Sequence, residues 1–171
     1  MTISDYNRLV DSNSDKLLRY ALKLTGEYNW AQDLVQDSYL KLWVHRVKIT
    51  IEHANPFLYK VLYNKMVDDK RKTQRTQLME NLPEQQRSGR GGSGTGLESK
   101  DLLDKAFRQL TDQQKQIILL RDWEGYSYKE IGGILEANES QVKVQLFRAR
   151  KKMKQVVTSL NNDYSKCDEN K

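Results

Sequence analysis

Three segments between residues 111 and 154 each begin with the sequence pattern of a capped helix. In this pattern, the capping box, a side chain at the N-cap accepts a hydrogen bond from the amide three residues later. A Glu or Gln at that later position binds back to the N-cap amide. The pairs are Thr111 with Gln114, Ser127 with Glu130, and Asn138 with Gln141. They predict three short helices and leave little freedom in where each helix begins.

Apolar residues follow these starts at helical spacing, so each helix is expected to bury one side. On the third helix the inward positions are Val142, Leu146, Ala149 and Met153, and the outward positions are Ser140, Lys143, Val144, Phe147, Arg148 and Lys151. Residues 139 to 154 hold six Lys or Arg and one acid. An isolated basic helix is usually a solvated face. Behind a capped support helix, however, it favours the reading helix of a helix-turn-helix DNA-binding unit.

Glycines mark the turns of this unit. Gly125 permits the turn between the first two helices, and residues 136 to 138 form a turn of helix-turn-helix length before the third. Gly132 and Gly133 lie inside the second helix, where each costs about 1 kcal/mol of helix propensity. Their presence predicts a close helix crossing.

Composition agrees with a nucleic-acid partner. The 171-residue chain has a formal net charge of +6, and its 37% hydrophobic residues recur mostly at helical period. We therefore expect an all-α protein. The only cysteine, Cys167, excludes an internal disulfide and a Cys-cluster zinc site, and His45 and His53 are too isolated to suggest a metal site. No cofactor is expected. The chain lacks a signal peptide and a membrane-length apolar run, which predicts a cytoplasmic protein.

The expected organisation is two small helical domains joined by a flexible linker. Residues 88 to 99 read SGRGGSGTGLES, a composition typical of a mobile tether, natural or engineered. We place one domain at 1–80, the linker at 81–100, the second domain at 101–160 and a disordered tail at 161–171. The glycines at 89 to 94 match the letters of a dinucleotide-binding motif, but no strand precedes them.

An acidic helix edge distinguishes the first domain. Asn29, with Gln32 three residues later, predicts a helix that begins there and continues to about Arg46. Its outward side carries Asp33, Gln36 and Asp37. Acids in a first helical turn complement the helix dipole, which explains Asp33 better than Asp37. A docking surface for a basic partner explains both.

A second helix of this domain is expected to begin at Asn55-Pro56, with proline at the first helical position. One side is apolar, and the other carries basic residues with Tyr59 and Tyr63 interleaved. Aromatic rings among cations suit single-stranded nucleic acid, because bases stack on the rings while the cations follow the phosphates. The alternative for each tyrosine is half-buried packing.

These segments resemble a known family. The sequence from Ala31 to Trp43, AQDLVQDSYLKLW, closely resembles the conserved-region-two helix of bacterial sigma factors of the extracytoplasmic-function (ECF) group. The segment from Phe57 to Lys72 resembles the adjoining promoter-melting segment. The segment from Gln109 through Arg150 resembles region four. The resemblance covers about residues 5 to 157, with its motifs in the family's order.

The resemblance implies a non-enzymatic factor that binds core RNA polymerase and directs promoter-specific transcription initiation. It implies promoter DNA, duplex and melted, as a partner and leaves room for an anti-sigma factor, with no membrane insertion of the chain itself. By this resemblance, the residues that dock on polymerase are Asp33, Gln36 and Asp37. The residues that capture the melted minus-ten strand are His53, Asn55, Tyr63, Asn64, Arg71 and Lys72. Recognition of the minus-thirty-five element falls to Lys143, Phe147 and Arg148, with Tyr128, Lys129, Arg150 and Lys151 nearer phosphate.

Two other functions are weighed against this one. A free-standing dimeric helix-turn-helix regulator would bind a symmetric operator without polymerase, but its dimer interface should be apolar at its centre, unlike the acidic edge. A nuclease or nucleotide-using enzyme would need a carboxylate cluster, a metal-ligand set or a phosphate loop. The paired acids Asp68 and Asp69 are consecutive on a predicted helix and point apart.

Overall fold

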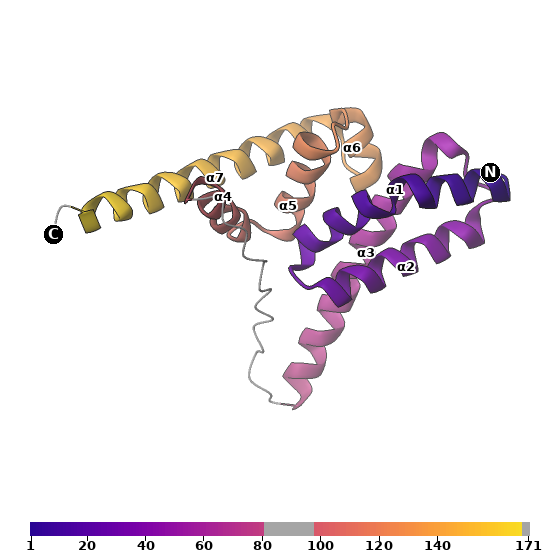
Figure 1. Ribbon diagram of the computed structural model, residues 1–171, viewed down its shortest axis with the longest axis horizontal. Coiled ribbons are helices and arrows are strands. Elements are labelled where there is room, and N and C mark those ends of the chain that lie inside the picture. Colours follow the sequence, from indigo (N-terminus) through magenta and orange to yellow (C-terminus); the bar gives the residue numbers. More distant parts are fainter. Residues whose placement is uncertain (81–97, 169–171) are drawn as a thin grey trace. The chain divides into compact units, whose positions relative to one another are not determined.

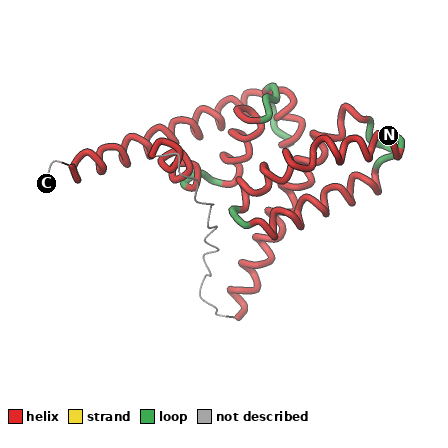
Figure 2. Tube along the Cα trace, in the orientation of Figure 1, coloured by secondary structure: helices red, strands yellow, loops and turns green. Residues whose placement is uncertain are grey.

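The structure, a computed structural model, describes residues 1–80 and 98–168 and divides the chain into two units. The units are Met1–Gly91 and Gly92–Lys171. All regular elements of the described ranges are helices, with no strand among them (Figure 2). The all-α prediction is therefore confirmed. Most of the predicted linker lies outside the described residues, but its end is helical, because α4 begins at Glu98.

The first unit consists of α1 (Ile3–Thr25), α2 (Tyr28–His45) and α3 (Ile51–Glu80). Helix α2 packs against both α1 and α3 (Figure 1). Helix α1 begins at a capping box formed by Thr2 and Asp5 and ends at Gly26, whose φ of 73° lies in the left-handed region that glycine adopts freely. The fully buried side chains come from all three helices and include Leu17, Leu34, Leu42, Leu58, Leu62 and Met66.

Both predicted helix starts in this unit are wrong. Helix α2 begins at Tyr28, its N-cap is Glu27, and Asn29 lies within the first turn. The reversal at Gly26 is so short that the Ala31 amide already donates to the Glu27 carbonyl, at 2.9 Å. Helix α3 begins at Ile51, with Pro56 inside it. Ala54 is fully buried, so the turn before the proline packs into the core, which offsets the hydrogen bond that proline cannot donate.

The second unit consists of α4 (Glu98–Arg108), α5 (Asp112–Ile118), the π-helical turn η1 (Leu119–Trp123), α6 (Tyr128–Leu135) and α7 (Glu139–Asp168). Helix α7 packs against α4, α5 and α6. Figure 1 shows its yellow end running past α4. This helix continues to Asp168, beyond residue 161 where the sequence predicted a disordered tail. Part of the core is a cluster of Leu110, Ile117, Ile118, Leu146 and Ala149.

The three capping boxes of the second unit are confirmed. Thr111 accepts from the Gln114 amide at 3.3 Å, Ser127 from the Glu130 amide at 3.2 Å, and Asn138 from the Gln141 amide at 2.8 Å. In each box the side chain three residues later accepts from the N-cap amide in return, at 3.1, 2.8 and 2.9 Å. These bonds fix where α5, α6 and α7 start.

The two glycines of α6 differ in their surroundings. A Cβ atom on Gly132 would lie 2.6 Å from the Ala137 carbonyl oxygen, whereas one on Gly133 would meet nothing within 4 Å. The close approach predicted for this pair therefore exists at Gly132 only. It comes from the turn before α7 rather than from a helix crossing. Glu136 of that turn has a left-handed φ of 55°.

Candidate nucleic-acid interface

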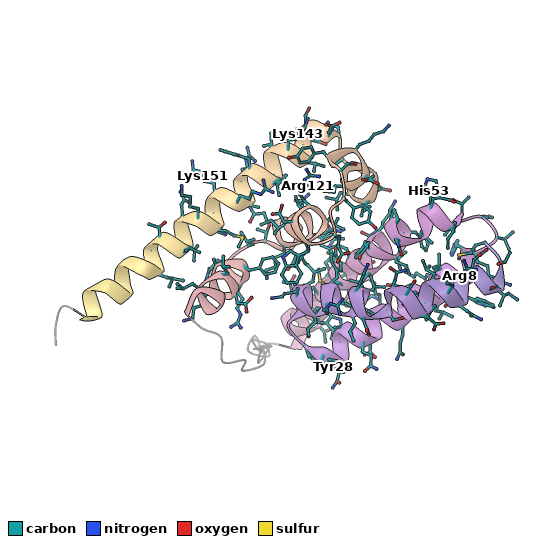
Figure 3. The ribbon with its side chains drawn as sticks, turned by 45° about the horizontal axis from the view of Figure 1, so that its top comes forward. Arg8, Tyr28, His53, Arg121, Lys143 and Lys151 are labelled. Carbon is teal, nitrogen blue, oxygen red and sulfur yellow. The ribbon has the colours of Figure 1, made fainter. Side chains whose placement is uncertain are left out.

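The outward face of α7 is exposed. Val142, Leu146 and Ala149 are buried, as the spacing predicted. On the opposite side Val144 is 48% exposed and Phe147 68% exposed, and Lys143, Arg148 and Lys151 are also exposed. Figure 3 shows Lys143 near the beginning of α7 and Lys151 farther along it. The structure thus presents cations and an apolar pair on a single helix face.

Tyr128, at the start of α6, lies beside two cations. The guanidinium carbon of Arg121 is 4.6 Å from its ring centroid, and the Nζ atom of Lys143 is 5.3 Å away. The Arg121 Nη1 also donates to the Tyr126 carbonyl oxygen, at 2.8 Å. Tyr128 is half-buried and packs against the core of the unit. Lys129, the next residue, is exposed.

Two of the predicted DNA-binding cations already hold carboxylates. Lys143 pairs with Glu139 at 2.8 Å, one helical turn away. Arg150 pairs with Asp122 of η1, with its Nε 3.4 Å from one carboxylate oxygen and its Nη2 closer to the other. The sequence did not predict Asp122 as part of this surface. Its 28-residue separation from Arg150 becomes a contact only through the packing of η1 against the other helices, and no local pattern encodes that packing.

On α3 the structure brings together only part of the predicted strand-binding set. At 100° per residue, His53, Asn64 and Arg71 fall within about 20° of one another, and all three are exposed. Tyr63 and Lys72 lie roughly 80 to 100° from Asn64, and Asn55 lies about 180° from it. The described helix therefore presents one exposed stripe of three residues rather than a patch of six.

Two residues of this stripe, His53 and Arg71, have polar neighbours within the chain. The Thr50 hydroxyl and the His53 ring nitrogen lie 2.9 Å apart, and Arg71 is 3.9 Å from Asp68.

Tyr59 is not available for stacking on bases. It is 5% exposed and packs edge to face on Tyr20, with ring centroids 4.7 Å apart. Interpreting it as an interleaved surface aromatic is therefore wrong, whereas Tyr63 is half-buried.

The predicted acidic edge lies on α2, with Asp33 and Gln36 exposed. The Asp37 side chain is 46% exposed and pairs with Lys65 of α3 at 3.4 Å. Lys65 also lies 3.3 Å from Asp69. The hydrogen bond to Asp69, with that to Asp37, raises the pKa of Lys65 above its ordinary value, so this ammonium stays charged. Asp37 therefore has an intramolecular partner.

Asp33 also shares a cleft with a residue predicted for a different partner. This cleft, of about 370 Å³, lies between the start of α2 and the middle of α3. Its lining residues are Glu27, Asn29, Trp30, Asp33, Asp69, Lys72 and Thr73. The prediction separated polymerase docking at Asp33 from strand binding at Lys72. The structure brings the two residues to one cleft.

Comparison with known families decides the relationship. The model of sigma-70 region 2 matches residues 9–76, and the model of sigma-70 region 4 matches residues 100–153. This chain belongs to the ECF sigma factors. The ECF RNA polymerase sigma factor SigL of Mycobacterium tuberculosis is 30% identical over 148 residues, covering 82% of each protein. SigM of Bacillus subtilis is 24% identical over 147 residues, covering 85% of this chain and 90% of the relative.

Solved sigma factors share the fold. The sigma factor RpoE from Bartonella quintana, in complex with the anti-sigma factor NepR, has a TM-score of 0.80 at 21% identity, covering 91% of this chain and 98% of that one. CnrH in complex with the cytosolic domain of CnrY has a TM-score of 0.64 at 18% identity, covering 90% and 88%. This ECF sigma factor directs promoter-specific transcription by RNA polymerase. Within its described residues no helix is long and apolar enough to cross a membrane.

Proposed function

We propose that the two units of this sigma factor divide promoter recognition between them. The first unit docks on core polymerase and captures the opened minus-ten strand, and the second reads the duplex minus-thirty-five element. The observation that carries this proposal is the outward face of α7, where exposed cations flank an exposed apolar pair above a buried apolar stripe. Two weak contacts in one chain gain affinity through effective concentration.

The α7 assignment separates base reading from phosphate binding. Arginine suits bidentate contact with guanine, whereas a phosphate contact carries no sequence information. Arg148→Ala should cost about 1 to 3 kcal/mol and relax preference at one position of the upstream element. Lys151→Ala should weaken binding to all sequences alike and reduce the salt dependence of binding, the slope of log K against log salt concentration, by about one unit. A holoenzyme titration on matched and mismatched promoters tests both, and equal losses on every sequence for Arg148→Ala would contradict its role.

Polymerase docking rests on the acidic edge of α2. Asp33 and Gln36 are exposed there, and Asp37 is partly exposed beside Lys65. Asp33→Lys together with Asp37→Lys should abolish co-purification with core polymerase, because it replaces attraction to a basic surface with repulsion. Asp11→Lys with Asp15→Lys, on exposed positions of α1, is the charge-matched control. Undiminished binding by a folded double variant, checked by circular dichroism, would remove the assignment.

Strand capture rests on the exposed stripe of α3. His53, Asn64 and Arg71 form its centre, with Tyr63 and Lys72 at its flanks and Asn55 farthest away. Asn64→Ala with Arg71→Ala should block promoter opening, measured by permanganate reactivity of unpaired thymines, while polymerase still binds. Normal opening would mean that the stripe is only a solvated face.

The remaining roles follow from the family. We infer that this factor acts in the cytoplasm, catalyses no reaction itself and is subject to an anti-sigma factor. The complex of the Bartonella quintana relative with NepR supports the last inference. Co-purification from cells under non-inducing conditions, with mass spectrometry of the bound proteins, tests it.

A further inference from the structure

Five charged side chains from two elements, η1 and α7, lie beside Tyr128 of α6 or pair with a neighbour there. The cations are Arg121 from η1 and Lys143 and Arg150 from α7, and the carboxylates are Asp122 from η1 and Glu139 from α7. Lys143 and Arg150 are seven residues apart, so they lie about 20° from each other on α7, on the side that faces α6 and η1. The outer cations Arg148 and Lys151 have no ion pair within the described part of the chain.

The two carboxylates hold the inner cations closely. Glu139 is 2.8 Å from Lys143, and Asp122 accepts hydrogen bonds from two nitrogens of Arg150. The hydrogen bond from Lys143 lowers the pKa of Glu139, and that to Asp122 raises the pKa of Arg150. Glu139 and Arg150 therefore stay ionised near neutral pH. Because the four side chains remain substantially exposed, a phosphate group can compete for either cation.

We propose that Glu139 and Asp122 are specificity-determining residues that withhold Lys143 and Arg150 from the phosphates of non-promoter DNA. The inference rests on the proposed role of α7 in binding the upstream element. Phosphate contacts provide most of the affinity for random DNA. When α7 lies shallowly on a non-promoter sequence, both ion pairs remain formed. Lys143 and Arg150 then make no contact with phosphate. Base contacts at the correct element seat the helix deeply enough for phosphates to displace the carboxylates, so discrimination improves.

Neutral isosteres test this proposal on the full chain. Glu139→Gln and Asp122→Asn are made singly and together, and binding to a short duplex of random sequence is measured by fluorescence anisotropy across a salt series. Each substitution should tighten random binding about three-fold and steepen the salt slope by about one unit, the contribution of one phosphate contact. Asp15→Asn, at an exposed position of α1, makes the same change in net charge and should leave the slope unchanged.

A second pair of variants separates freed cations from altered folding. Adding Arg150→Gln to Asp122→Asn, and Lys143→Gln to Glu139→Gln, should abolish each gain, because no cation remains to be freed. Single-variant slopes equal to those of the unsubstituted chain and of Asp15→Asn would overturn the proposal. So would gains that survive removal of the cations.

The proposed role of α7 can fail separately. In that case the holoenzyme would show no preference for its upstream element, which overturns both proposals. A holoenzyme that keeps this preference while the isosteres leave the salt slope unchanged would overturn only the role of Glu139 and Asp122.

Discussion

The ammonium of Lys65 on α3 lies 3.4 Å from the carboxylate of Asp37 on α2. The same ammonium lies 3.3 Å from Asp69, so a single cation joins the proposed docking edge of α2 to the proposed strand-binding helix α3. Because all three side chains are partly exposed, each pair contributes at most about 1 kcal/mol to folding. Under the proposed docking role of Asp37, the Lys65–Asp37 pair matters more for function than for folding, since it reduces the negative charge that a polymerase surface would meet.

Removing Lys65 should therefore strengthen polymerase docking. In Lys65→Gln the Asp37 carboxylate loses its intramolecular partner and presents its full charge to a basic surface. We expect the affinity for core polymerase to rise several-fold, with a steeper salt dependence, in a competition assay. Lys60→Gln, elsewhere on α3, is the control. Weaker binding by Lys65→Gln would show that Asp37 acts through the fold rather than through docking.

The two glycines of α6 should respond oppositely to alanine. Gly132→Ala forces its Cβ toward the Ala137 carbonyl oxygen, which must shift from 2.6 Å, so α6 and the turn before α7 should be destabilised. Gly133→Ala meets open space and should stabilise the helix by about 1 kcal/mol. Hydrogen exchange of the α6 amides measures both. Equal effects at the two positions would contradict the close contact at Gly132.

The capping box of α6 should make the second unit sensitive to acid. The hydrogen bond with Ser127 lowers the folded-state pKa of Glu130 below its ordinary value of 4.5. Its contribution to stability is therefore complete above about pH 4.5 and is lost as the pH falls through the folded pKa. In Glu130→Gln the amide oxygen can still accept, and this acid-dependent loss should disappear from urea unfolding curves. The same loss of stability at low pH in Glu130→Gln would contradict the assignment of that loss to Glu130.

The apolar pair on α7 should read thymine. In the major groove thymine alone presents a methyl group, and an apolar side chain such as Phe147 is its usual contact. Replacing one thymine of the upstream element with deoxyuridine removes only that methyl, and holoenzyme binding should weaken about four-fold. Holoenzyme carrying Phe147→Ala should bind the thymine and deoxyuridine promoters equally. Leu103→Ala, on an exposed position of α4, should keep the difference.

Local signals in the sequence predicted some features well and others poorly. The capping boxes and the buried stripe of α7 depend on residues three or four apart, so their positions were correct. Asn29 and Pro56 misplaced two helix starts, because tertiary burial of Ala54 and the short reversal at Gly26 override local preference. The pairing of Arg150 with Asp122 depends on packing across 28 residues, which no local spacing reveals.

The division of labour between the two units is tested most directly on two partial promoters. One is a forked DNA with only the single-stranded minus-ten sequence, and the other is a duplex with only the upstream element. Holoenzyme carrying Asn64→Ala with Arg71→Ala should lose affinity for the fork and keep it for the duplex. Holoenzyme carrying Phe147→Ala with Arg148→Ala should show the reverse. Equal losses on both DNAs for either variant, or losses on the opposite DNA, would contradict the division.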